Sequence, residues 1–118
     1  MINQLEMPVY IKEALPELSN DLNAHKKDNP FEALNTLFTF TTRNVMEHNY
    51  RVVKRCFDIA DKLYSRGNGV VKNAVQNVFV YSFTKMFHSF PGEKKELMAM
   101  IHISLYTLYI SQLYQGGC

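Results

Sequence analysis

The sequence predicts an all-α protein, an antiparallel bundle or short array of about five helices that form a single domain over residues 1–118. Apolar residues recur at helical spacing along most of the chain, and proline, glycine and asparagine separate these stretches. Strand-like alternation occurs once only, without a second strand to pair with it. A length of 118 residues, with 47% apolar and 20% charged residues, fits one folded domain.

The first helical segment covers about residues 7–25. Pro8 suits a first helical turn, whereas Pro16 interrupts the apolar pattern and splits the segment into two short helices. The apolar positions are Val9, Ile11, Leu15, Leu18 and Leu22.

The second segment begins at Asn29 and ends near residues 48–49. Asn29 can cap the helix, Pro30 suits its first position, and Glu32 completes a capping box. The third segment, about residues 50–66, has a regular apolar stripe opposite a charged face. We expect Gly67 to end that helix as its C′ residue.

The fourth segment covers about residues 69–88, with Asn68 as its cap. Residues 77–83 alternate like a strand, but a helical face fits the longer window better. Two apolar faces predict a central, largely buried helix. Val71, Ala74, Val75, Val78, Ser82 and Met86 form the first face, and Phe79, Val80, Phe83 and Phe87 form the second.

The fifth segment covers about residues 93–114, and no charged residue follows Glu96. A helix that is apolar all round is usually buried, so this helix either lies at the centre beside the fourth or is covered by a partner. Its uncharged stretch approaches membrane-spanning length but contains polar residues and lacks a basic flank, so we expect no membrane insertion.

The cysteine content and the N-terminus predict a cytoplasmic protein, and the charge distribution is uneven. Residues 1–42 carry a net charge of −3, residues 43–85 carry +5, and the remainder is neutral. The basic middle is weaker than the stripe of a typical nucleic-acid-binding protein. The N-terminus does not resemble a signal peptide, and two cysteines, Cys56 and Cys118, do not make a disulfide framework.

No residue constellation predicts catalysis or a cofactor. The four histidines lack a metal-ligand motif, so we expect no metal. Cys56 lies on an apolar stripe and is expected to be an inert buried thiol. Asp58 and Asp61 are one turn apart, but flanking lysines favour a solvated ion-pair face over a catalytic dyad.

Two candidate surfaces and one candidate pocket remain. The aromatic side of the last helix is a candidate self-interface, in a possible homodimer, formed by Tyr106, Tyr109, Ile110 and Tyr114. The candidate polar partner surface comprises Arg51, Lys54, Arg55, Asp58, Lys62, Lys72 and Asn73. A pocket between helices could be lined by Tyr64, Tyr81, His88 and His102.

The leading hypothesis is therefore a small, non-catalytic protein-interaction module of the immunity or adaptor type, whose protein partner the sequence does not identify. One alternative is a ligand-binding or enzymatic helical bundle that uses the pocket. The other is a weak nucleic-acid-binding regulator that uses a basic patch between Arg51 and Lys72. Its recognition helix would be the fourth segment, which becomes apolar on nearly every side after its first half, so nucleic acid is an unfavoured partner.

The run CFDIADKLYSRGNGVVKNAVQNVFVYSF, from Cys56 to Phe83, resembles a family of small bacterial all-helical proteins with no assigned function. The resemblance extends from Pro30 toward the C-terminus. It implies an all-α bacterial fold and brings no catalytic or ligand-binding residues with it.

Overall fold

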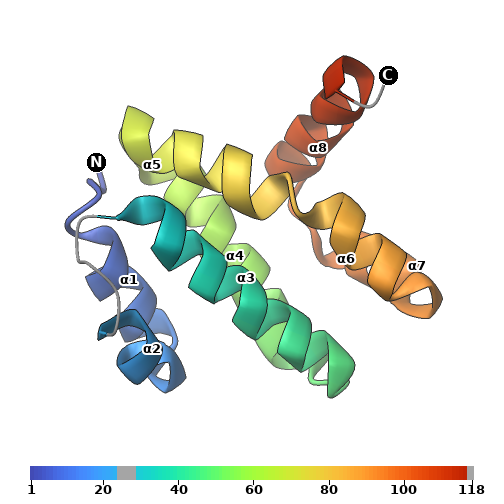
Figure 1. Ribbon diagram of the computed structural model, residues 1–118, viewed down its shortest axis with the longest axis horizontal. Helices are drawn as coiled ribbons and strands as arrows, with labels where there is room; N and C mark the ends of the chain where they lie inside the picture. The colour runs from blue at the N-terminus through green and yellow to red at the C-terminus, as the bar shows by residue number, and fades with distance from the viewer. Residues whose placement is uncertain (24–28, 117–118) are drawn as a thin grey trace.

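The computed structural model describes residues 1–23 and 29–116, and within them the protein is all-α, as predicted (Figure 1). The last two residues of the predicted first segment, 24 and 25, lie outside the described residues, and so does Cys118. The helices are α1 (Met7–Ala14), α2 (Ser19–Asn23), α3 (Pro30–Met46), α4 (Tyr50–Arg66), α5 (Gly69–Ala74), α6 (Phe83–Ser89), α7 (Lys94–Met100) and α8 (Ile103–Gly116). Three shorter helical turns connect them: η1 (Pro16–Leu18), η2 (Val75–Val80) and η3 (Pro91–Glu93).

The break predicted at Pro16 is confirmed. The α1 helix ends before Leu15, whose extended backbone leads into η1 and then α2. The N-terminal signal of α3 is also confirmed, because the Asn29 side chain accepts a hydrogen bond from the Glu32 amide at 3.2 Å. α3 and α4 then form an antiparallel hairpin that other helices surround (Figure 1).

The C-terminal ends of α3 and α4 differ from the prediction in which residue adopts the left-handed conformation. α3 ends at Met46, and His48, two residues later, has a positive φ of 58°. The Asn49 and His48 amides bond the carbonyls of Asn44 and Val45, the two bonds of a Schellman motif. Gly67, expected in that left-handed conformation, is extended instead, with φ −74° and ψ 156°.

Gly67 is required for space rather than for backbone conformation. A Cβ atom there would lie 2.4 Å from the carbonyl oxygen of Leu63 and 2.6 Å from Cγ1 of Val71. On the other side, Ile2 pairs with the α4–α5 turn, donating to the Arg66 carbonyl and accepting from the Asn68 amide. The close approach therefore joins α4, α5 and the N-terminal segment.

The fourth predicted segment is helical but not one regular α-helix. Residues 75–80 form a π-helical turn, in which the Tyr81 amide donates to the Gln76 carbonyl five residues earlier. One extra residue in a turn rotates everything after it by about 100°. The two predicted apolar faces thereby merge into one buried face, and Val78 and Ser82 are only half-buried.

The fifth predicted segment is two helices rather than one. It breaks at Ile101, whose ψ of 130° is extended, and α8 begins at Ile103. α8 lies at the edge of the molecule, away from α1 and α2 (Figure 1), which corrects the expectation that the last helix is central. Among residues 103–114 of α8, only Leu105 and Tyr109 are buried.

An aromatic cluster at the heart of the core connects α3, α4, η2, α6 and α8. Phe79 packs edge-to-face on Phe38 and Phe57, with ring centroids 5.6 and 6.1 Å apart. The centroid of Phe83 lies 6.0, 5.6 and 5.8 Å from those of Phe57, Phe79 and Tyr109. Within the described ranges, every helix is too short or too polar to cross a bilayer.

Replacing Gly67 by alanine should lower the free energy of unfolding by about 1–3 kcal/mol, because the new methyl group collides with the Leu63 carbonyl and the Val71 side chain. Urea unfolding followed by circular dichroism measures the change. Gly69→Ala is the matched control, since its new methyl group would meet no atom within 4 Å and the chain gains helix propensity. Equal effects at the two glycines would contradict the proposed close approach.

Candidate functional site

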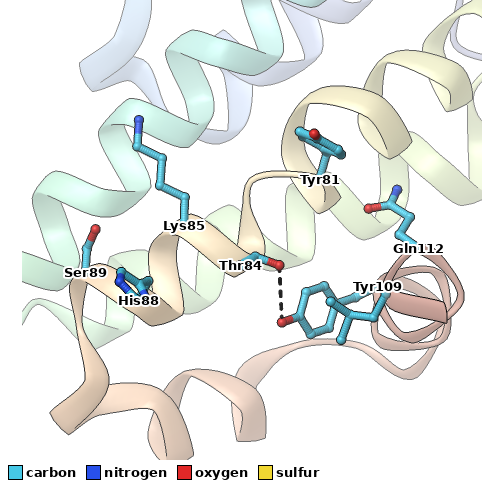
Figure 2. A pocket seen from close by; sticks show the side chains of 8 residues that line it. Tyr81, Thr84, Lys85, His88, Ser89, Tyr109 and Gln112 are labelled. Carbon is cyan, nitrogen blue, oxygen red and sulfur yellow. Dashed lines mark hydrogen bonds between the residues drawn. The ribbon is translucent and has the colours of Figure 1, made fainter. Parts of the chain in front are cut away.

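A cleft of about 540 Å³ lies between α6 and α8. Figure 2 shows Tyr81, Gln112 and Tyr109 at one end of the cleft and His88 and Ser89 at the other. Its lining comprises Tyr81, Thr84, Lys85, His88, Ser89, Tyr109, Gln112 and Leu113.

Tyr109 forms the fixed floor of this cleft. It is only 6% exposed, and its ring packs on Phe83 and Phe87 with centroids 5.8 and 5.5 Å away. Its hydroxyl accepts a hydrogen bond from Thr84 of α6 at 3.5 Å (Figure 2). Tyr81, by contrast, is 71% exposed and stands at the mouth.

The π-helical turn fixes the geometry at the same end of the cleft. The Gln112 side chain of α8 donates to the Gln76 carbonyl at 2.8 Å, the carbonyl that also accepts from the Tyr81 amide. Ser82 donates to the Val78 carbonyl at 2.6 Å. The turn therefore anchors α8 and places Tyr81 beside it. π-helical turns frequently occur at functional sites.

The sequence located this cleft only in part. Tyr81 and His88 line it, as predicted for the candidate pocket, whereas Tyr64 on α4 and His102 at the α7–α8 break do not. Five further lining residues were not predicted as pocket residues: Thr84, Lys85, Ser89, Gln112 and Leu113. They come together because of the π-helical turn and the break in the last helix, and neither feature has a glycine or proline to signal it.

His102 belongs to a second polar cluster, which joins the α7–α8 break to α4. Its Nε2 atom lies 2.5 Å from an Asp58 carboxylate oxygen, and its Nδ1 atom lies 3.6 Å from Asp61. The Ser104 hydroxyl donates to the other Asp61 oxygen at 2.5 Å. Asp58 and Asp61 thus converge on His102, and no ion pair between Asp58 and an α4 lysine occurs within the described part of the chain.

The arrangement of this cluster favours a structural clamp over a catalytic site. In a Ser-His-Asp triad the serine hydroxyl donates to the histidine, but Ser104 donates to Asp61 instead. Residues 1–23 and 29–116 contain no group of three or more side chains placed to hold a metal ion. The residues are partly exposed, and the cluster joins two elements that are 43–44 residues apart in sequence.

The candidate polar partner surface is divided by the fold. Arg55 bonds the Ala14 carbonyl of α1, and Asp58 bonds His102, so these two residues connect helices. The other five members are exposed: Arg51, Lys54, Lys62, Lys72 and Asn73. Lys72 and Asn73 lie on α5, whereas the first three lie on α4.

The candidate self-interface is divided as well. Tyr109 is buried in the cleft floor and does not belong to an exposed aromatic side. Tyr106 and Ile110 are half-buried, whereas Tyr114 is 80% exposed. Sequence spacing could not separate them, because a helix without charges gives no indication of which face meets water.

Cys56 is fully buried on α4, as its place in the apolar stripe predicted. Burial raises the pKa of its thiol to about 11 from an ordinary value of 9.0, although a hydrogen bond with Thr41 opposes the shift. A nucleophilic cysteine needs a lowered pKa and access to its substrate, and Cys56 has neither.

A family model described as a domain of unknown function, DUF7674, matches residues 8–115, which is nearly the whole chain. No curated protein and no solved structure matches the chain.

Cys56 should react with Ellman's reagent at pH 8 only when the protein unfolds, because the buried thiol stays protonated. Rates measured over a urea series in a Cys118→Ser background should follow the global unfolding equilibrium. Fast labelling of the folded protein would contradict burial.

The raised pKa of Cys56 also makes the stability of the fold depend on pH. Its contribution to the free energy of unfolding is fully present below pH 9 and is lost as the pH rises toward 11. The difference in free energy of unfolding between the unchanged protein and Cys56→Ala should therefore shrink over that range.

Removing the His102 clamp should loosen α8 without unfolding the protein. In His102→Ala, the free energy of unfolding should fall by less than about 1 kcal/mol, since the pair is partly exposed. Amide hydrogen exchange should nevertheless accelerate in α8 and not in α3. Lys62→Ala, at an exposed position on α4, is the control. Uniform exchange changes in α3 and α8 would contradict a local clamp.

Proposed function

The chain belongs to the DUF7674 family, whose description assigns no activity, and we propose from the geometry that it is a non-catalytic protein-interaction module that binds a protein partner through the outer face of α8. One observation carries the proposal: a helix without a single charged residue stands at the edge of the molecule and exposes Ile103 and Tyr114 to water.

The outer row of α8 consists of residues that repeat every three to four positions, namely Ile103, Thr107, Ile110 and Tyr114. Ile103 is 77% exposed and Tyr114 is 80% exposed. A helix at a protein surface normally carries charged residues on its outer face, and an apolar outer face is typical of a contact surface. Tyrosine is enriched at such contacts because its ring is apolar while its hydroxyl tolerates water.

A shallow hollow continues the outer row toward α7. It has a volume of about 410 Å³, and Ile103 forms one of its edges. The remaining lining residues are Lys95, Met98, Ala99, Ile101 and Tyr106. An apolar side chain of a partner that enters this hollow would be surrounded by methionine, isoleucine and tyrosine, the environment of an interface anchor.

The cleft between α6 and α8 favours a second candidate function, the binding of a small ligand. It lies on a different side of α8 from the outer row, and its volume is within the ordinary range for small-molecule sites. The two functions are compatible, because α8 presents separate residues to each.

Site-specific photo-crosslinking tests the protein-interaction proposal. A benzophenone side chain at position 103 or 114 should give discrete crosslinked products in extracts of the cells that contain the protein. The same group at position 62, on the exposed polar face of α4, is the matched control. A product of twice the chain's mass identifies a second copy as the partner, which light scattering of the purified protein would verify.

Ile103→Glu should reduce the crosslinks from position 114, and Tyr114→Glu those from position 103, by about tenfold or more without unfolding the protein, since both side chains are largely exposed. Circular dichroism checks the folding. Products of equal yield from positions 103, 114 and 62, or products that survive both glutamate variants, would overturn the proposal.

A further inference from the structure

We propose that the cleft between α6 and α8 binds a small amphiphilic carboxylic acid, with its apolar body on Tyr81, Tyr109 and Leu113 and its carboxylate at the Lys85–His88–Ser89 end. The proposal goes beyond the protein-interaction function and does not depend on it, because the cleft and the outer row of α8 use different residues.

The size and the floor of the cleft suit a small apolar body. Its volume of about 540 Å³ lies within the range of roughly 300–1,000 Å³ that is usual for small-molecule sites. Tyr109 offers a rigid aromatic surface, and Tyr81 and Leu113, 71% and 40% exposed, stand over it. These exposed apolar groups would lose contact with water when a ligand covers them.

The charges around the cleft select an anion. Lys85 and His88 lie one turn apart on α6, and among the described residues no aspartate or glutamate lines the cleft. The opposite wall, α8, has no charged residue. The next acid along the chain, Glu93, faces His48, with 3.8 Å between its carboxylate oxygen and the Nδ1 atom of His48. A carboxylate in the cleft would therefore meet a cation without competition from a carboxylate of the protein.

The geometry of the cationic end suits a headgroup at the rim rather than a buried charge. In Figure 2 the Lys85 stem is directed away from Tyr109, and the residue is exposed, as is usual for a lysine whose ammonium group is in water. Its flexible stem can bring the ammonium group to a carboxylate at the rim, while the Ser89 hydroxyl and the His88 ring supply further hydrogen-bond donors.

The walls of the cleft are fixed before any ligand binds. Thr84 and Tyr109 join α6 to α8 at one level, and Gln112 joins α8 to the π-helical turn at another. Ligand binding therefore does not have to order the cleft, which lowers the entropic cost of association. This is the reason to expect a saturable site rather than a loose apolar surface.

Three probes of equal chain length test the proposal: octanoate, octan-1-ol and octyltrimethylammonium, added to the ¹⁵N-labelled full chain. Octanoate should shift the backbone amide signals of the cleft residues, including those of Thr84, Ser89 and Leu113, in a saturable way. Octanol should bind at least about tenfold more weakly, because it lacks the charge-assisted hydrogen bonds, and the cationic probe should be weakest.

Lys85→Glu should weaken octanoate binding by about tenfold or more, whereas Lys62→Glu, an identical charge change at an exposed site on α4, should leave it unchanged. Equal binding of all three probes would overturn the assignment of an anion, and so would equal effects of the two variants. Shifts confined to Ile103 and Tyr114 would place the probe on the outer row of α8 and overturn the cleft assignment. The absence of any shift would overturn the site itself.

Discussion

The packing of Phe79 and Phe83 is the constraint on which the rest of the structure depends. These two rings contact aromatic residues of α3, α4, α6 and α8, so four helices take their positions from one pair of side chains. A regular α-helix would present Val71, Val75 and Val78 to the core and turn Phe79 partly away from it. The π-helical turn resolves this conflict, because its extra residue brings both phenylalanines to the buried side.

α8 packs few apolar side chains into the core, and hydrogen bonds of its polar side chains fix its direction. It buries Leu105 and Tyr109, but hydrogen bonds at three levels fix its course: Ser104 to Asp61, Tyr109 with Thr84, and Gln112 to the Gln76 carbonyl. Because α8 buries few apolar side chains, these hydrogen bonds, and not apolar packing alone, set its position on the core. Both proposed binding surfaces lie on this helix, as binding elements often do when a rigid body supports them.

Local signals in the sequence predicted the helices but not their continuity. The caps at Asn29 and Asn68 and the break at Pro16 follow from chemistry within a few residues, and each is present in the structure. The break at Ile101 and the π-helical turn have no such local cause. They depend on Asp58 and on the aromatic core, which lie far away in sequence. The cleft, which both features create, therefore could not be assembled from the sequence, although Tyr81 and His88 were recognised as candidates.

Because of the π-helical turn, the number of residues in this segment determines how α6 is oriented relative to α5. A relative that lacks one residue between Val75 and Val80 could restore regular α-helical hydrogen bonding there, and its α6 would rotate by about 100° relative to α5. Tyr81 and Thr84 would then no longer face α8. A single-residue gap at this place in an alignment would therefore divide the family into members with the cleft and members without it, even where every lining residue is conserved.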